Sequence, residues 1–241
     1  MSKQKKHNIT FTIAKRELHS YFTSPIAYIV TALFLIATGI FFYSTFFLNK
    51  KAELRIFFTL LPYSFCLFIP AITMRVFSEE QKSGSIETLM TLPVTETQVV
   101  LGKFLASFIS SSTMLIPTLF YIITLLFFGK PDFGPIAGGY FGAVLLCAVY
   151  SATGVFASAI TKNQIIAFFT SLGINAAFTL IHFFMVFIPG TFVKMLNYFS
   201  IVSHFNSVAR GIIDTRDVIY FITLIAVFII AAIHVQEKRR K

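Results

Sequence analysis

Polar and apolar residues come in long blocks along this chain, and six apolar stretches stand out. Each is close to the roughly 20 residues that an α-helix needs to cross the hydrocarbon core of a membrane. They are Ile26–Leu48, Phe57–Met74, Phe104–Phe128, Tyr140–Ile160, Ile165–Ile188 and Val218–Val235. The second and the sixth are short but still sufficient for a span with little tilt. The pattern predicts an all-α polytopic membrane protein with six transmembrane helices, forming a single membrane domain over residues 1–241.

A further helix is expected ahead of the first span, over residues 8–24. Apolar residues recur there at helical spacing, whereas the charged residues fall mostly on other faces. Such a helix can lie in the headgroup layer with its basic side chains toward anionic lipid. It is either a simple surface anchor or an interface helix that also touches a cytoplasmic partner. The candidate contact residues of this N-terminal amphipathic interface helix are Lys15, Arg16, Glu17 and Leu18.

The longest polar interval between spans covers residues 75–103 and carries signals for a short helix of its own. Gly84 breaks the preceding helix, and Ser85 is a good N-cap for a new one. Glu87 in the first turn complements the positive end of the helix dipole, and Pro93 stops the helix. Its apolar edge is formed by Ile86, Leu89 and Met90. An exposed apolar edge on a short helix favours docking into a groove of another protein.

The alternative is that this interval folds back onto the inner leaflet as a second amphipathic anchor. Acidic residues outnumber basic ones in it, beginning with Glu79 and Glu80, and an acidic segment is repelled by anionic lipid. The sequence TETQ at residues 95–98 is a capping box, so the next helix starts before the third span begins. We therefore expect the helices on both sides to project into the cytoplasm and to present the interval to a partner.

The interval between the fifth and sixth spans, residues 189–217, is too apolar for a simple loop. Short interfacial or re-entrant helices buried against the protein would cover its apolar side chains. We expect such short extracellular helices there, acting either as an outer gate or as a structural lid.

Composition and charge agree with a membrane protein. The chain is 56% hydrophobic and 12% charged, whereas an average soluble domain is about 25% charged. The net charge of +10 comes from basic residues at the ends of the apolar stretches rather than from one patch, which argues against nucleic acid. Most of the 20 Lys and Arg residues share a side with the two termini. The exceptions are Lys50, Lys51, Arg55, Lys130, Lys194, Arg210 and Arg216. The positive-inside bias then places both termini in the cytoplasm, with the spans in the bacterial inner membrane.

The sequence points to no chemistry of its own. It holds no phosphate loop of the form G-x-x-x-x-G-K-[ST], and no motif for hydrolytic catalysis. None of the six spans has an internal Asp, Glu, Lys or Arg, although proton- and ion-coupled transporters commonly need such groups. Cys66 and Cys147 have no partners at metal-ligand spacing. We therefore predict no catalytic residue, no metal and no cofactor on this chain, with energy supplied by a partner.

Two polar or small-residue patterns lie within the spans. One face of the fifth span carries Ser171, Asn175, Thr179 and His182. This stripe should avoid lipid, so it either makes interhelical hydrogen bonds, including across a dimer seam, or lines the path of a polar or amphiphilic substrate. The fourth span carries Gly138, Gly142, Gly154 and Ser158. Small residues at this spacing predict close helix packing.

Three segments carry a resemblance to a known family. They read AKRELHSYFTSPIAYI, SEEQKSGSIETLMTLPVTETQVVLGK and SHFNSVARGIIDTRDVIYF. Together with the six-span layout they resemble the ABC-2 type transporter permeases, and most of all the branch known from gliding motility and nitrous-oxide-reductase maturation. The residues that match the coupling segment of that family are Glu79, Glu80, Gly84, Glu87, Leu89 and Pro93. Ser85 stands where Thr is common and keeps the capping hydroxyl.

The resemblance implies a function. The short helix within residues 75–103 would be a coupling helix seated in a cleft of a separate ATP-binding subunit, which binds ATP and Mg²⁺. Two permease chains would pair with two ATPases, with an auxiliary envelope subunit as a further candidate partner. We therefore expect the permease subunit of an ATP-driven exporter. The alternative is a non-transporting membrane anchor or assembly factor that tethers an ATPase to a larger envelope machine.

Overall fold

The computed structural model describes residues 9–49, 53–85, 94–129, 131–184, 196–212 and 214–240. Every regular element in these ranges is a helix. The helices are α1 (Ile9–Thr23), α2 (Pro25–Asn49), α3 (Arg55–Thr73), α4 (Ser78–Ser83), α6 (Glu96–Thr113), α7 (Leu119–Phe128), α8 (Phe133–Ile160), α9 (Gln164–Phe184), α11 (Ile201–Ala209) and α12 (Thr215–Arg240).

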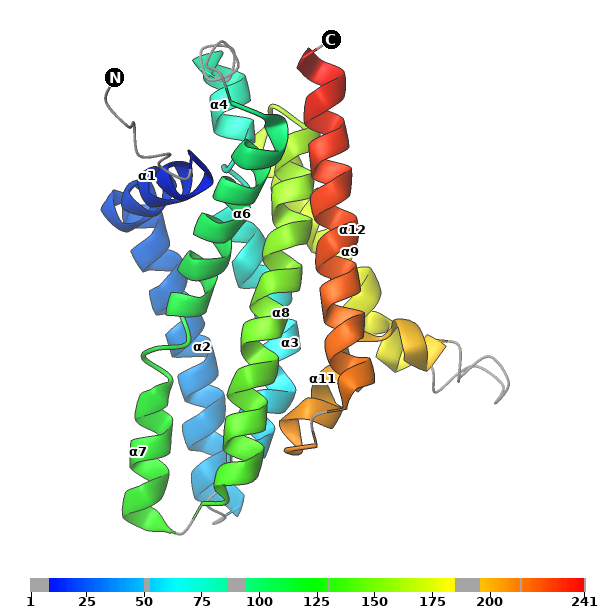
Figure 1. Ribbon diagram of the computed structural model, residues 1–241. Helices are drawn as coiled ribbons and strands as arrows, with labels where there is room; N and C mark the ends of the chain where they lie inside the picture. Colours follow the sequence, from blue (N-terminus) through cyan, green and yellow to red (C-terminus); the bar gives the residue numbers. More distant parts are fainter. Residues whose placement is uncertain are drawn as a thin grey trace, which may run out of the picture.

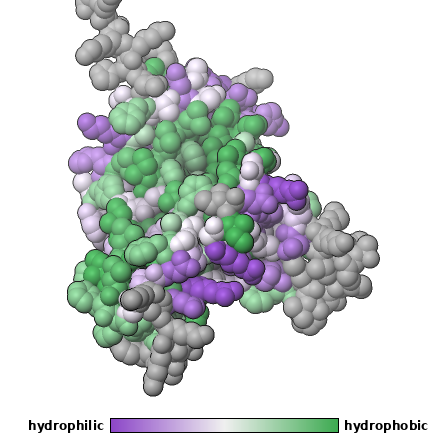
Figure 2. Space-filling view, turned by 60° about the horizontal axis from the view of Figure 1, so that its bottom comes forward, coloured by the Kyte–Doolittle hydropathy of each residue, from purple (hydrophilic) through white to green (hydrophobic). Residues whose placement is uncertain are grey.

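The long helices run side by side, and successive ones run in opposite directions (Figure 1). Both ends of the chain, α1 and α4 lie at one end of the bundle, which we call the α1 end. The tip of α7 and the starts of α3 and α8 lie at the other, which we call the α7 end. Figure 2 looks toward the α7 end, where hydrophilic side chains gather below the hydrophobic flank of the bundle.

Among the described residues, five helices are long and apolar enough to cross a membrane, by length and composition. They are α2, the run Arg55–Ser83 that contains α3, α8, α9 and α12. These agree with five of the six stretches that the hydropathy pattern marks as spans. Many large apolar side chains on them face outward, among them Tyr28, Ile36, Phe169 and Ile230. An apolar outer surface of this kind is expected where lipid covers the protein.

The third expected span, Phe104–Phe128, is not one continuous helix, so the six-helix detail of the prediction is not confirmed. The chain turns at Met114–Thr118, between the 18-residue α6 and the 10-residue α7. Backbone bonds there run to the third residue back, as from the Leu115 N–H to the Ser112 oxygen. Pro117 has no N–H to continue an α-helical ladder, which explains the break. In Figure 1, α7 continues from α6 toward the α7 end.

Helix α8 forms the centre of the bundle, in contact with α3, α6, α9, α11 and α12. Its small residues allow these approaches. A Cβ atom at Gly154 would overlap the side chain of Thr73, and one at Gly138 would overlap the main chain of Val208. A Cβ at Gly142 would lie 3.2 Å from the ring of Phe205. The close packing predicted for this span is confirmed.

Helix α1 lies across the bundle against α6 (Figure 1). It buries Ile13, Ala14 and Tyr21 against the protein, whereas Phe11 remains 68% exposed. Gly102 makes this contact possible, because a Cβ there would come within 2.9 Å of both the Ile13 side chain and the Thr10 oxygen. Much of the expected apolar face of α1 is therefore covered by protein.

The described part of the interval between α9 and α12 contains the short helix α11, at the α7 end. Its buried side chains are Ile201, Val202, Phe205 and Val208. They bring α11 into contact with α3, α8, α9 and α12. The apolar residues of α11 thus find cover against the protein, whereas Tyr198, Phe199 and Ile212 remain exposed.

Candidate functional site

A buried lysine organises the α1 end. Lys103 on α6 has no exposed surface, although it carries a charge. Its Nζ lies 3.1 Å from Glu17 Oε1 on α1 and 3.0 Å from Glu80 Oε2 on α4. It also donates a hydrogen bond of 2.8 Å to the main-chain oxygen of Val76 and lies 5.1 Å from the centre of the Phe77 ring. A buried ammonium requires this kind of complete satisfaction.

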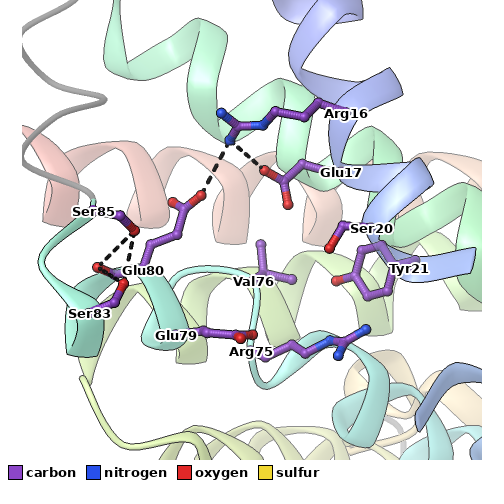
Figure 3. A pocket seen from close by; sticks show the side chains of 10 residues that line it. All are labelled: Arg16, Glu17, Ser20, Tyr21, Arg75, Val76, Glu79, Glu80, Ser83 and Ser85. Atoms are coloured by element: carbon purple, nitrogen blue, oxygen red, sulfur yellow. Dashed lines mark hydrogen bonds and ion pairs between the residues drawn. The ribbon is translucent and has the colours of Figure 1, made fainter. Parts of the chain in front are cut away.

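Arg16 completes the group on the solvent side. Its guanidinium lies 2.8 Å from Glu17 and 3.3 Å from Glu80 (Figure 3). We call Arg16, Glu17, Glu80 and Lys103 the ionic cluster. The two cations balance the two carboxylates, and the four residues come from three helices, so the cluster joins α1, α4 and α6.

The positions of these residues follow from local packing. The predicted capping box is confirmed at the start of α6, where the Thr95 side chain accepts a bond from the Gln98 N–H. Further along α6, Gly102 admits Ile13 of α1. Glu17 lies one helical turn after Ile13, and Lys103 directly follows Gly102. Close contact of the two helices therefore brings Glu17 and Lys103 together.

Charges within the cluster shift the pKa values of Glu17 and Arg16. Burial alone would raise the pKa of Glu17, but Lys103 and Arg16 together outweigh it and hold that pKa below the ordinary value. The hydrogen bond from Arg16 to Glu17 raises the pKa of the guanidinium. Both pKa shifts favour the charged forms of Arg16 and Glu17.

A cavity of about 680 Å³ opens between α1 and α4 beside the cluster. Figure 3 shows side chains from both helices lining it. On its floor, Arg75 donates a hydrogen bond of 2.7 Å to Ser24 and lies 5.3 Å from the centre of the Tyr21 ring. Buried Tyr21 lies 3.4 Å from the Ser107 hydroxyl of α6. Arg75 and Tyr21 thus connect the segment between α3 and α4 to α1 and α6.

Helix α4 is also fastened to the central helix α8. The Ser158 hydroxyl accepts bonds from the Phe77 and Ser78 N–H groups at 2.9 and 3.0 Å. It donates in turn to the Met74 oxygen at 2.9 Å. Gln81 donates a bond of 3.1 Å to the Ala159 oxygen. The break between α3 and α4 is therefore stabilised by α8.

The far side of the predicted coupling segment has its own attachment. Arg240, at the end of α12, lies 2.5 Å from Glu96 and 3.4 Å from the Val94 oxygen. That hydrogen bond lowers the pKa of Glu96 below its ordinary value. Arg239 donates a bond of 2.6 Å to the Ile160 oxygen at the end of α8. Residues 86–93 are thus flanked on both sides by segments that ion pairs tie to long helices.

Some of the predicted coupling and interface residues lie within the described ranges, and others lie outside them. Ile86, Glu87, Leu89, Met90 and Pro93 lie outside the described residues. Gly84 ends α4 in the left-handed conformation, with φ of 75°, which suits glycine. Ser85 and Glu79 are exposed at the cavity. Lys15 is exposed, and Leu18 packs partly buried against the core.

Sequence reasoning missed two members of this site. Lys103 and Arg240 each had a signal, in the Gly-Lys pair before the third span and in the basic tail of the chain. Both were interpreted as topology signals, since a charge near the end of a span commonly is one. Their partners could not be identified without the fold.

The stripe on α9 faces the interior of this chain. Ser171, Asn175 and Thr179 have no exposed surface, and His182 is partly buried. Thr153 of α8 donates a bond of 2.6 Å to Asn175, and the Thr179 hydroxyl lies 2.5 Å from that of Tyr150. These contacts fit interhelical hydrogen bonding within one chain rather than a surface that faces a substrate. The Asn175 amide nitrogen has no partner among the described residues.

Comparison with known proteins places the chain in a family. The model of the ABC-2 family transporter protein matches residues 51–235, which is most of the chain and runs from just before α3 into α12. No curated protein matches the chain. The matched range contains α4, α6 and the end of α8, whereas α1 and the last residues of α12, including Arg239 and Arg240, lie outside it. The chain therefore belongs to the ABC-2 transporter family, as a multi-pass transmembrane permease component that is not itself catalytic and that associates with an ABC ATP-binding subunit.

Proposed function

We propose that this permease is driven by a separate ATPase that binds residues 86–93 at the α1 end. The observation that carries the proposal is the attachment of both flanks of that segment. The ionic cluster holds α4 on one side, and Arg240 holds Val94 and Glu96 on the other. Flanks attached in this way would pass a displacement on to the long helices α6 and α12.

The contacts define where a displacement would travel. Movement of α4 would act on α6 and α1 through Lys103, and on α8 through Ser158. Because α8 contacts five other helices, a shift at its end would reach the whole bundle. Packed helices move as rigid bodies between discrete arrangements, which is the type of change that a transport cycle needs.

The rest of the proposal follows the resemblance and the charge distribution. Two permease chains pair with two ATPases, which bind ATP and Mg²⁺, and the complex exports its substrate. The α1 end faces the cytoplasm and the α7 end faces outward, so α6 and α7 together make a sixth passage of the bacterial inner membrane. The chain is nearest to the gliding-motility and nitrous-oxide-reductase maturation branch, in which an auxiliary envelope subunit joins the complex. Residues 189–217 form the outer gate.

The second candidate is a membrane anchor that tethers an ATPase without transporting. The burial of Ser171, Asn175 and Thr179 within one chain favours it, because these were the polar residues best placed to line a path. Sealed vesicles separate the two functions. A permease shows ATP-driven movement of a substrate or lipid probe, whereas a tether recruits the ATPase and shows none.

Docking is tested by coexpression with the ATP-binding subunit and purification of the complex. The double variant Glu87→Lys, Leu89→Asp should lose copurification and ATPase stimulation, because it reverses a charge and removes an apolar anchor. Glu237→Lys is the matched control, since it makes the same charge change at an exposed position of α12. Undiminished copurification of the double variant would refute docking at this segment.

A further inference from the structure

The α7 end holds a pocket that the proposed coupling does not use. A cavity of about 440 Å³ lies between the start of α3, the start of α8 and the end of α11. This volume is within the usual range of small-ligand sites. Its floor includes the buried side chains of Phe58 and Ile136, and its charged lining residues are Glu53, Arg55, Asp132 and Arg210. We call it the α7-end pocket.

Its charges do not neutralise one another. Among the described residues, neither guanidinium forms an ion pair or a side-chain hydrogen bond, and neither does the carboxylate of Glu53. Asp132 accepts a single bond, from the Gly134 N–H at the start of α8. Two cations and two anions thus line one cavity with their binding capacity largely unused. A ligand that carries both signs of charge would satisfy them all.

The start of α3 adds to the attraction for an anion. Its N-cap, Leu54, provides no side-chain bond to the first turn, so N–H groups remain open there at the positive end of a 19-residue helix. Arg55 belongs to the same turn, and Arg210 faces the same cavity from α11. A phosphate group here would meet two guanidinium groups and a helix N-terminus.

The walls of the pocket are rigidly held. A Cβ at Gly138 would overlap the Val208 main chain, and Gly211 lies in the left-handed region with φ of 84° against the backbone of Gly134. Helices α8 and α11 therefore meet backbone to backbone beside the pocket. Since the frame is fixed by packing, a ligand would need little reorganisation to bind.

An apolar cavity adjoins this polar one. It has about 330 Å³, shares Glu53 and Arg55 with the α7-end pocket, and is otherwise lined mainly by Phe42, Phe46, Ile56 and Phe57 of α2 and α3. A polar site for a headgroup thus continues into an aromatic site on the flank of the bundle. This order matches an amphiphile, with its charged group at the end of the bundle and its chain along the apolar flank.

From these features we propose that the α7-end pocket binds an amphiphile with a zwitterionic phosphoamine headgroup. The phosphate is held by Arg55 and Arg210, the ammonium by Glu53 and Asp132, and the acyl chain by the cavity around Phe57. Binding requires no ATPase, so this proposal is independent of the proposed function.

Native mass spectrometry of the full-length chain in detergent tests it, with phosphatidylethanolamine and phosphatidylglycerol as probes. We expect tighter binding of phosphatidylethanolamine, because phosphatidylglycerol has no ammonium for the carboxylates. In Arg55→Gln, Arg210→Gln the affinity for both lipids should fall at least about tenfold, as is typical for the loss of charged hydrogen bonds. Arg216→Gln is the control, since Arg216 is an exposed arginine near the same end that lines neither cavity.

The carboxylates have a separate test. Glu53→Gln, Asp132→Asn should abolish the preference for phosphatidylethanolamine, while the asparagine still caps α8. Free phosphoethanolamine should compete only at much higher concentration, because it lacks the acyl chain; equal potency would exclude the apolar cavity from the site. Binding of the double arginine variant within twofold of wild type would overturn the proposal, as would equal binding of both lipids by wild type or an equal loss in Arg216→Gln.

Discussion

Lys103 is the residue on which the α1 end depends most. Removing its ammonium leaves the two carboxylates of Glu17 and Glu80 with Arg16 as the one cation left in the ionic cluster. We expect Lys103→Met to reduce the free energy of unfolding by about 3–5 kcal/mol, the usual cost of breaking a buried ion pair, and toward the lower value because both carboxylates retain some exposure. Denaturant unfolding measures this change.

The matched control is Lys82→Met, at an exposed position in the last turn of α4. It should change stability by no more than about 0.5 kcal/mol. The double variant Lys103→Met, Glu80→Gln should recover part of the loss, because it leaves one carboxylate, Glu17, paired with one cation, Arg16. If Lys103→Met and Lys82→Met behave alike, the ionic cluster does not stabilise the protein.

The lowered pKa of Glu17 predicts a dependence of stability on pH. A carboxyl whose pKa is lower in the folded state binds a proton more readily when unfolded, so its contribution is present above the ordinary value of 4.5. The contribution is lost as the pH falls below that value and through the folded pKa. In Glu17→Gln, the decline of the unfolding midpoint between about pH 5 and pH 3 should be shallower than in wild type. An unchanged slope would contradict the assignment.

The ionic cluster shows which site residues can be predicted from the sequence and which cannot. The helical pattern marked Arg16 and Glu17, and the polar interval marked Glu80, as candidate contacts. Lys103 lies 86 positions from Glu17, and the two meet only because α1 folds back onto α6. Helical periodicity describes one element at a time, so it cannot indicate a contact between two elements this far apart in sequence.

At the scale of elements, the docking of α1 depends on the absence of a side chain at Gly102. Alanine there would place its Cβ within 2.9 Å of Ile13 and of the Thr10 oxygen. We expect Gly102→Ala to destabilise the protein by about 1–3 kcal/mol and to expose α1 to proteases. Gly173→Ala is the control, because that glycine of α9 has open space around it and alanine should stabilise a helix by about 1 kcal/mol. Equal effects of the two substitutions would rule out close packing of α1.

Helix α11 is held to α12 by His204. Its Nδ1 lies 2.6 Å from Asp217, its Nε2 lies 3.0 Å from the Tyr198 oxygen, and its ring stacks on Tyr220 at 4.0 Å. Both ring nitrogens face acceptors, so each donates when both bonds form. We expect His204→Ala to speed amide hydrogen exchange in α11, consistent with a loss of about 1.5–3 kcal/mol for a charged hydrogen bond. His234→Ala, at a site 64% exposed, should leave exchange in α11 unchanged.

The break between α6 and α7 is a feature that hydropathy does not predict. The apolar stretch Phe104–Phe128 predicts one helix, yet the chain breaks before Pro117 and continues as α7. Hydropathy measures how readily a segment enters lipid, whereas continuity of a helix depends on which backbone groups can pair. The second span remains one helix, α3, although Pro62 and Pro70 lie inside it. Hydropathy located all five other spans as long helices.

At the scale of the whole molecule, α1 and the end of α12 lie at the same end of the bundle (Figure 1). The even alternation of spans and the basic termini favoured this arrangement before the fold was known. Neither could indicate that the last helix reaches across to the start of α6. Arg240 makes that connection with Glu96, and Arg239 bonds the Ile160 oxygen at the end of α8.

This connection leads to a prediction about coupling rather than stability. The Arg240–Glu96 pair is partly exposed, so it should contribute no more than about 1 kcal/mol to folding. Its position on the far flank of residues 86–93 means that losing it frees that flank from α12. We therefore expect Arg240→Glu and Glu96→Arg each to lower stimulation of the partner ATPase several-fold, with an unfolding midpoint close to that of wild type.

The double variant Arg240→Glu, Glu96→Arg distinguishes a paired contact from two separate effects. It restores opposite charges across the same contact, so ATPase stimulation should recover toward wild type. Lys238→Glu is the control for charge, since it changes the same helix end outside the pair. If both single variants stimulate the ATPase as wild type does, the contact of Arg240 with Val94 and Glu96 does not contribute to coupling. Coupling then runs through α4 alone. If the double variant is as impaired as the sum of the single ones, Arg240 and Glu96 act independently and the tie between α12 and α6 is not what transmits the movement.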